Sequence, residues 1–227
     1  MTKNIVDKID DSVKIDTVLA SVSDKSGLEI FIPKLLEINP DINILSTGGT
    51  YAKIKEILGK DADRCLTKVS EYTGQPETQG GLVKTLDFKI YLGLLTETYN
   101  NSHQNDLKRV SGKKIDMVIV NLYPFAETIA KPGVTCEMAR GNIDIGGPTM
   151  IRASAKNYIR VASVVDPLSY PSIIETMQKN NGKLTLKDRF NLAKKAFEHT
   201  AVYDRTIADF LFSRTLNQVN DCYNTGE

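Results

Sequence analysis

The segment "TVLASVSDKSGLEIFIPKLLEINPDINILSTGGTYAKIKEIL" (residues 17–58) decides the fold class of this chain. It contains, twice in succession, a short run rich in β-branched residues, a turn of small polar residues and a stretch with helical periodicity. The first strand is predicted over 17–23 and its helix over 27–38; the second strand is predicted over 42–45 and its helix over 51–58. A repeated strand–turn–helix unit is typical of an α/β domain with an open parallel sheet.

Three further runs extend the predicted sheet along the chain. They are "CLTKV" (65–69), "MVIVNL" (117–122) and "VASVV" (161–165), the last of which ends at Asp166 and Pro167. The nearly continuous apolar run at 117–122 is typical of a parallel strand that is buried on both faces. We therefore expect a sheet flanked by helices, with ligands bound beyond the carboxyl ends of the strands.

A long helical pattern from Thr185 to about Phe212 follows the sheet. Thr185 and Asp188 have the spacing of a helix-capping pair. The residues expected on its apolar face are Leu186, Phe190, Ala193, Phe197, Ala201, Ala208 and Leu211.

The predicted organisation has three parts. An N-terminal tail (1–16) precedes the domain (17–213), and a C-terminal tail (214–227) follows it. Within the domain we distinguish a core (17–166) and a helical extension (167–213).

Composition excludes several classes of partner and site. The 227 residues include 29 Lys and Arg and 28 Asp and Glu, so the formal net charge is +1, which argues against a nucleic-acid or anionic-membrane partner. No run approaches the roughly 20 apolar residues of a membrane span, and the N-terminus is polar, so we expect a cytoplasmic protein. Three scattered cysteines (Cys65, Cys136, Cys222) and two histidines (His103, His199) indicate neither disulfides nor a metal site.

Two turns carry anion-binding chemistry at matching positions. Residues 23–26 (Ser-Asp-Lys-Ser) follow the first strand, and residues 46–50 (Ser-Thr-Gly-Gly-Thr) follow the second. Backbone N–H groups at glycines, hydroxyls and a helix N-terminus all favour an anion. We predict one phosphate bound between the two turns, although such residues are also ordinary helix starts.

Other polar residues lie near the predicted sheet edge. Lys84 and Thr85 fall in a long irregular segment, and Tyr123 and Asn121 lie at the end of the central strand. Each has an ordinary alternative: a solvated loop lysine, a phenol that covers the core, or an amide bonded to the backbone.

The stretch "NIDIGGPTMIRASAKN" (142–157) combines an acid, a double glycine and two cations. Asp144 precedes Gly146 and Gly147 at a predicted turn into a helix, on which Arg152 and Lys156 share one face. The alternative is that Asp144 only caps the turn and both cations are exposed.

Seven motifs in order carry a family resemblance: "SVSDKSG", "STGGT", "VSEYTGQPE", "GGLVKTL", "NLYPF", "NIDIGGPTMIRASAKN" and "KAFEHTAVYD". Over about residues 17–213 the chain strongly resembles the IMP cyclohydrolase domain of the bifunctional purine-biosynthesis enzyme. The resemblance implies a methylglyoxal-synthase-like fold. It also implies closure of 5-formamidoimidazole-4-carboxamide ribotide to inosine monophosphate (IMP) with loss of water, a small-molecule nucleotide substrate, no cofactor and a homodimer.

The resemblance also implies roles for individual residues. It places the catalytic groups at Lys84, Tyr123, Asp144 and Lys156: Lys156 exchanges the proton, Asp144 orients the carboxamide, and Tyr123 with Lys84 stabilises the oxyanion. It places substrate contacts at Ser23, Asp24, Lys25, Thr47, Gly48, Gly49, Thr50, Thr85, Asn121, Ile145 and Gly146.

The chain departs from the family pattern in one loop. Leu82 stands where many relatives have arginine, Asp87 and Phe88 where they have His-Pro, and Tyr91 where they have another histidine. These changes put substrate affinity in doubt. Because the sequence lacks the formyltransferase domain, we expect either a separate AICAR formyltransferase as partner or a truncated chain.

Two other functions fit part of the pattern. One is a non-catalytic nucleotide-phosphate sensor, in which both turns bind phosphate but the altered loop does not support ring closure. The other is a methylglyoxal synthase, which would need a further acid and a histidine near the phosphate.

Overall fold

Five parallel strands form the centre of the structure, a computed structural model that describes residues 5–75 and 85–224. In spatial order the strands are β4 (Leu66–Lys68), β3 (Asn43–Ser46), β2 (Thr17–Val22), β5 (Met117–Asn121) and β6 (Ala162–Val164). The register pairs Val18 of β2 with Ile44 of β3 and with Met117 of β5. The predicted parallel sheet is confirmed, and each predicted strand lies within two residues of its expected limits.

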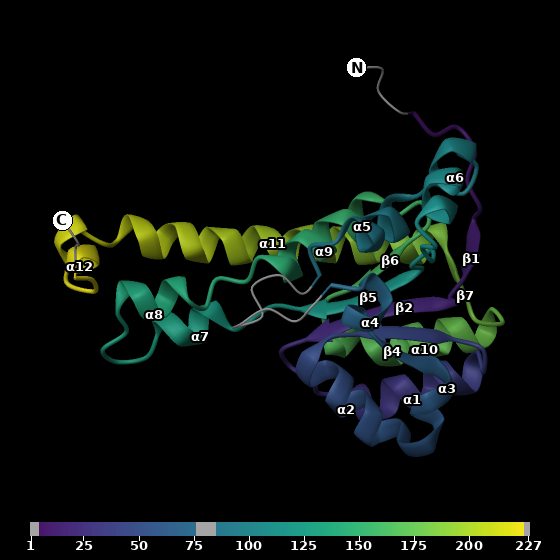
Figure 1. Cartoon of the computed structure of the whole chain (residues 1–227), viewed down its shortest axis with the longest axis horizontal. Helices are drawn as coiled ribbons and strands as arrows, with labels where there is room; N and C mark the ends of the chain where they lie inside the picture. The colour runs from purple at the N-terminus through teal and green to yellow at the C-terminus, as the bar shows by residue number, and fades with distance from the viewer. Residues whose placement is uncertain (1–4, 76–84, 225–227) are drawn as a thin grey trace.

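Helices cover both faces of this sheet (Figure 1). One face carries α1 (Leu28–Ile38), α2 (Gly48–Leu58) and α10 (Tyr170–Lys179); the other carries α5 (Phe88–Leu95), α9 (Gly146–Lys156) and α11 (Leu186–Phe212). Side chains alternate between the two layers, so Val18 packs toward α1 and Leu19 toward α9. Both layers are apolar, which explains the nearly continuous apolar run at the central strand.

Short elements connect these layers. They are the 3-10 turns at Gly59–Asp61 and Pro167–Ser169, and the helices α3 (Ala62–Cys65), α4 (Val69–Thr73), α6 (Asn101–Arg109), α7 (Phe125–Ile129), α8 (Cys136–Arg140) and α12 (Leu216–Asn220). In Figure 1, α7, α8 and α12 lie beyond the sheet, alongside the C-terminal part of α11.

The long helix α11 confirms one prediction and corrects another. The capping box between Thr185 and Asp188 is present. The predicted apolar face is wrong, because Phe190 and Phe197 are 45% and 40% exposed. The residues that are buried are Arg189, Leu192, Ala193, Ala196, Thr200, Tyr203 and Phe210. Polar Arg189 and Tyr203 lie on this face because each hydrogen-bonds to distant backbone, which an apolar pattern does not reveal.

The segment expected to be an N-terminal tail contains a strand in the structure. Strand β1 (Ser12–Lys14) pairs antiparallel with β7 (Lys183–Thr185), and Ile15 is fully buried. The guanidinium of Arg189 donates to the carbonyls of Asp10 and Asp11 at 2.9 and 3.0 Å. The partner strand comes some 170 residues later, so local sequence could not indicate the pairing. The C-terminal tail likewise contains a short helix, while the domain boundaries stay a prediction.

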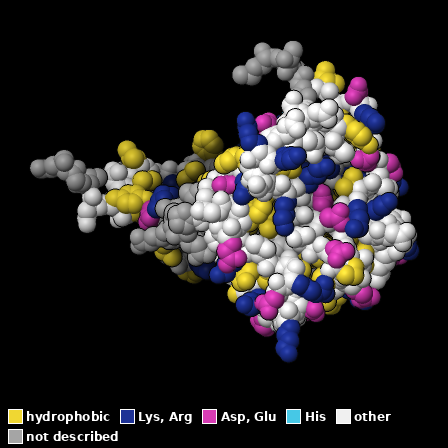
Figure 2. All heavy atoms as spheres, turned by 45° about the vertical axis from the view of Figure 1, so that its right-hand side comes forward, with side chains coloured by type: hydrophobic (Ala, Val, Ile, Leu, Met, Phe, Trp, Pro, Cys, Tyr) yellow, Lys and Arg dark blue, Asp and Glu magenta, His cyan; other side chains and the backbone are white. Residues whose placement is uncertain are grey.

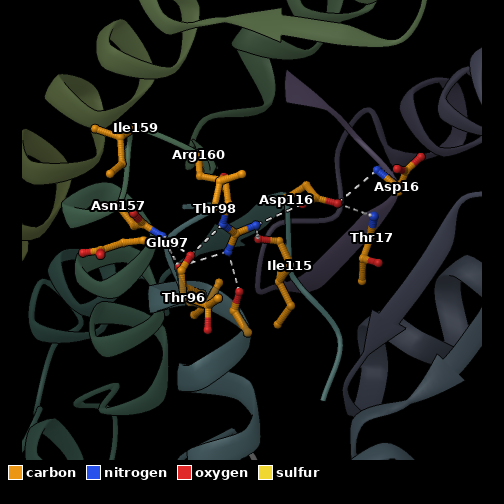
Figure 3. Close-up of polar contacts among 12 residues, drawn as sticks. Asp16, Thr17, Thr96, Glu97, Thr98, Ile115, Asp116, Asn157, Ile159 and Arg160 are labelled. Carbon is orange, nitrogen blue, oxygen red and sulfur yellow. Dashed lines mark hydrogen bonds and ion pairs between the residues drawn. The ribbon is translucent and has the colours of Figure 1, made fainter. Parts of the chain in front are cut away.

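A buried ion pair fixes the amino ends of the central strands (Figure 3). Arg160 Nη1 lies 3.0 Å from Asp116 Oδ1, and the two side chains are 3% and 10% exposed. Arg160 also donates to the carbonyls of Gly93, Thr96 and Ile115. The other Asp116 oxygen accepts from the N–H groups that start β2, those of residues 16 and 17, at 3.1 and 2.9 Å. The pair therefore links the amino ends of β2 and β5 to the segment that follows α5.

The surface agrees with the small net charge. Figure 2 shows Lys and Arg interspersed with Asp and Glu over the visible face, without a patch of one sign. Among the described residues, no helix combines the length and apolar character that crossing a bilayer requires.

Candidate functional site

A pocket of about 420 Å³ lies at the carboxyl ends of β2, β3 and β5. The predicted site residues that line it are Ser23, Lys25, Thr47, Gly48, Gly49, Thr50, Thr85, Asn121, Tyr123, Asp144, Ile145 and Gly146. Residues separated by more than 120 positions thus surround one cavity, as expected for an open α/β sheet.

The two small-residue turns are joined by their hydroxyl groups. Ser21 Oγ lies 2.8 Å from Thr47 Oγ1, so the side chain of Thr47 turns toward β2 instead of capping α2. Thr50 Oγ1 accepts from Val22 N–H at 2.9 Å and lies 3.1 Å from the Val22 carbonyl. These bonds hold the carboxyl end of β2 against the start of α2.

Lys25 places a cation over the glycine turn. Its Nζ donates to the Ser23 carbonyl at 3.2 Å. The same side chain passes 3.8 to 3.9 Å from the point where a Cβ on Gly49 would lie. A ligand at this turn therefore meets the ammonium group and glycine backbone together, which is suited to a phosphate.

Two helices begin at the pocket, and each has 11 residues. Neither N-cap residue, Thr47 for α2 or Ile145 for α9, caps its helix with a side chain. In the described structure, Gly48, Gly49 and Gly146 donate no backbone hydrogen bond. The positive ends of both helix dipoles and these N–H groups make the pocket favourable for an anion.

Asn121 and Asp24 organise the first turn through hydrogen bonds, and of the two only Asn121 lines the pocket, while their substrate contacts stay a prediction. Asn121 Oδ1 accepts from the N–H groups of Ser23 and Asp24 at 2.7 and 2.9 Å, and its Nδ2 donates to the Asp24 carbonyl at 2.8 Å. The Asp24 carboxylate accepts from Ser26 N–H and Oγ at 2.9 and 2.6 Å, and these bonds lower its pKa. An ionised carboxylate would repel a phosphate, and Asp24 does not line the pocket.

Asp144 occupies the opposite wall and explains the double glycine. Its Oδ1 accepts from Gly147 N–H at 2.9 Å. A Cβ on Gly147 would lie 2.5 Å from Asp144 Oδ2, and a Cβ on Gly146 would lie 2.7 Å from Thr85 Oγ1, so a side chain at either position would displace a group that lines the pocket. Burial raises the pKa of Asp144, an effect that the N–H groups of Gly147 and Tyr123 partly offset.

Tyr123 and Thr85 also line the pocket. Tyr123 is 53% exposed, so its ring lies at the rim rather than in the core, whereas Thr85 is 4% exposed. Lys84 and Leu82 lie outside the described residues.

The structure does not bring Lys156 into the pocket. Lys156 is the last residue of α9, whereas the pocket is lined by the first turn of that helix. Nine residues separate it from Gly147, a rise of roughly 13 Å at about 1.5 Å per residue. Arg152 is also exposed, and its guanidinium lies 5.6 Å from the centre of the Phe197 ring.

The departure at Asp87 has a structural role. Asp87 is 6% exposed and caps α5 by accepting from Lys89 N–H at 2.8 Å. It is not among the residues that line the pocket. The Asp87 carboxylate therefore caps the start of α5 and does not line the pocket.

Several contributors were missed from sequence, and Ser21 and Tyr203 are two of them. Ser21 lines the pocket, and its position two residues before Ser23 places it on the same side of the strand. Tyr203 bonds to the backbone of Asp144 at 2.8 Å, for which no sequence signal exists because the two are 59 residues apart. In the ranges 5–75 and 85–224, no group of three or more His, Cys, Asp or Glu side chains is placed to hold a metal ion.

Comparison with known proteins divides the chain into two matched regions. Residues 27–149 match the family described as the MGS-like domain, and residues 154–226 match the AICARFT/IMPCHase bienzyme family.

Individual relatives agree with these matches. The bifunctional purine biosynthesis protein PurH of Neisseria meningitidis serogroup A is 48% identical over 199 residues, which cover 88% of this chain and 36% of the relative. PurH of Synechococcus sp. is 46% identical over 193 residues, covering 85% and 36%. The chain thus spans about a third of the length of these relatives. The crystal structure of ForH superposes with a TM-score of 0.74 at 28% identity, covering 86% of this chain and 96% of ForH.

Proposed function

Because the chain belongs to the MGS-like domain family, and because its sequence from residue 154 onward matches the AICARFT/IMPCHase bienzyme family, we propose that it is an IMP cyclohydrolase. In this reaction the carboxamide nitrogen of 5-formamidoimidazole-4-carboxamide ribotide attacks the formyl carbon of the same molecule. Water leaves and the purine ring of IMP forms. The proposal includes a cytoplasmic homodimer and an AICAR formyltransferase activity that supplies the substrate.

One observation carries the proposal: a single pocket holds anion-binding groups at one end and an acid with a phenol at the other. Lys25, the Ser21–Thr47 hydroxyl pair and the start of α2 would bind the ribotide phosphate. Asp144 and Tyr123 would then lie beside the imidazole substituents. Holding two groups of one molecule in attack geometry removes much of the entropic barrier.

The residue types suit an intramolecular condensation. A carboxamide is a weak nucleophile, so a carboxylate that accepts its N–H makes attack easier, typically by about 10²- to 10⁴-fold. We assign this role to Asp144, whose raised pKa makes it a stronger base than an ordinary aspartate. Tyr123, together with Lys84, would donate to the formyl oxygen as it becomes negative, at about 3 kcal/mol per donor.

Proton exchange by Lys156 stays a prediction from the resemblance. The residue lies at the far end of α9, so the proposed steps do not depend on it. Lys156→Ala tests that assignment: loss of turnover with nucleotide affinity retained would return the lysine to the mechanism.

The experiment is to mix the purified chain with the formamido ribotide and follow the purine absorbance and IMP by chromatography. The reaction should proceed, and Asp144→Asn should abolish most of it while IMP still binds in calorimetry. Binding of IMP by the wild-type chain without any conversion would instead support the nucleotide-phosphate sensor.

Dihydroxyacetone phosphate is the control substrate for methylglyoxal synthase activity. Neither His103 nor His199 lines the described pocket, so we expect no methylglyoxal. Its formation at a rate comparable with ring closure would contradict the proposed function.

A further inference from the structure

The position of Asp144 depends on something outside its own loop. Residues 141–145 join α8 to α9 without helix or strand. The Asp144 carboxylate bonds to Gly147 at 2.9 Å, but that partner is only three residues on and moves with the same segment. The Tyr123 N–H also acts on the Asp144 carboxylate and lowers its pKa, but neither of these bonds holds the backbone of the loop itself.

Tyr203 on α11 supplies an anchor for this backbone. Its hydroxyl oxygen accepts from Asp144 N–H at 2.8 Å and lies 3.5 Å from the Asn142 carbonyl. The Tyr203 hydroxyl therefore contacts the backbone of the loop that carries Asp144, although Tyr203 lies 59 residues later in the chain. Burial raises the pKa of Tyr203, so the group stays a neutral phenol at neutral pH.

The ring of Tyr203 ties this anchor to the other wall of the pocket. Tyr203 is 8% exposed and packs edge-to-face on Phe125, with ring centres 6.2 Å apart at 69°. Phe125 is 1% exposed and starts α7, two residues after Tyr123. One side chain thus contacts both the loop of Asp144 and the segment that carries Tyr123.

We propose that Tyr203 is a positioning residue for ring closure: its hydroxyl fixes the backbone of Asp144 so that the carboxylate meets the substrate carboxamide. This inference rests on the proposed function. It gives the C-terminal helix a part in the reaction, although α11 contributes no residue to the pocket lining. Because the phosphate-binding turns follow β2 and β3, loss of the hydroxyl should affect turnover more than binding.

Tyr203→Phe isolates the hydroxyl, since phenylalanine retains the contact with Phe125. The partly buried Asp144 N–H loses its acceptor, which corresponds to about a tenfold change or more in an equilibrium constant, so we expect kcat to fall about tenfold or further. KM and the affinity for IMP should stay within about threefold, because no phosphate contact changes. Hydrogen exchange of residues 142–146 should become faster than in the wild type.

Tyr72→Phe is the matched control. The Tyr72 hydroxyl also accepts from a backbone N–H, that of Lys113 at 2.7 Å, and it lies outside the pocket lining. The substitution removes the same kind of bond at a different place. We expect kcat and the exchange of residues 142–146 to match the wild type.

The outcomes separate the inference from the proposed function. A wild-type chain that does not convert the formamido ribotide overturns both. A wild-type chain that converts it, with Tyr203→Phe equal to Tyr72→Phe in kcat, overturns only the role of Tyr203. If Tyr203→Phe does not fold, exchange in the wild type decides: an Asp144 amide that exchanges as fast as in an unstructured peptide also overturns the role.

Discussion

The side-chain amide of Asn121 holds the backbone of Asp24 from both sides. Its Oδ1 accepts from Asp24 N–H at 2.9 Å, and its Nδ2 donates to the Asp24 carbonyl at 2.8 Å. A third bond, from Ser23 N–H at 2.7 Å, completes the clamp. The end of β5 thereby sets the shape of the turn after β2, which carries the ammonium group of Lys25.

This clamp predicts the effect of Asn121→Asp. A carboxylate can accept both N–H groups but cannot donate to the Asp24 carbonyl, and it adds negative charge beside the proposed phosphate site. The lost bond and the repulsion should weaken IMP binding by about tenfold or more. Isothermal calorimetry measures this directly.

Asn43→Asp is the matched control for that variant. Asn43 starts β3, at the opposite end of the sheet, and its Nδ2 also donates to a backbone carbonyl, that of Asp41 at 3.3 Å. IMP affinity should not change. Equal weakening by the two substitutions would mean that Asn121 acts through general stability.

Lys25→Met tests the cation over the glycine turn. A hydrogen bond from an ammonium group to a phosphate contributes roughly 1.5–3 kcal/mol, so KM should rise by about ten- to a hundredfold. The acid and phenol are untouched, so kcat at saturation should fall by less than about threefold. Lys34→Met, at an exposed pair with Glu37 on α1, is the control. A drop in kcat without a change in KM would contradict an anchoring role for Lys25.

Local sequence predicted the sheet well because its determinants are local. Runs such as 17–23 and 117–122 are apolar with β-branched residues, and the first is followed by serine and glycine and the second by proline. The pairing of β1 with β7 and the burial of Arg189 depend on contacts some 170 residues apart. Such contacts leave no periodic pattern, so the N-terminal segment was expected to be a tail.

In the candidate site, too, the sequence indicated the locally determined features and missed the contacts between distant residues. Glycines and hydroxyls at strand ends identified both turns, and the structure explains Gly147 by its close approach to Asp144. For Asn121 the sequence left a backbone bond and a ligand contact open, and the structure shows bonds to backbone groups of the neighbouring turn. Helical spacing could not show that Lys156 would lie a whole helix length from the acid, because spacing defines a face but not which end meets the pocket.

The buried pair of Arg160 and Asp116 predicts a stability effect that is separate from activity. Asp116→Asn leaves the guanidinium buried without its counter-charge, which should lower the free energy of unfolding by about 3 kcal/mol. Urea denaturation followed by circular dichroism measures the change. Asp61→Asn removes the exposed pair with Arg64 and should have little effect, since such pairs contribute little. Equal effects of the two variants would contradict the structural role of Arg160.

Asp144 predicts a pH dependence of turnover. Burial raises its pKa above the ordinary value of 3.8, and the proposed role needs the ionised form. Turnover should therefore fall as the pH drops through this raised pKa, so the acid limb of the kcat profile should lie above the range of an exposed aspartate. In Asp144→Asn that limb should be absent from the residual rate. An acid limb of unchanged position in the variant would assign the titration to another group.

The raised pKa of Asp144 also predicts that its ionised carboxylate lowers the stability of the folded chain. A group whose pKa is higher in the folded chain than in the unfolded chain makes the folded state bind more protons between the two values. Stability then falls as the pH rises through that window, and the loss persists at neutral pH.

Asp144→Asn retains an acceptor for Gly147 N–H but removes the buried charge, so it should unfold at a higher temperature than the wild type at pH 7. The difference should vanish at a pH below 3.8, where both forms are neutral, and Asp63→Asn, exposed on α3, should show no such trend. A variant less stable than the wild type at pH 7 would mean that the carboxylate is held by stronger partners than the N–H groups of Gly147 and Tyr123, and that its charge stabilises the fold.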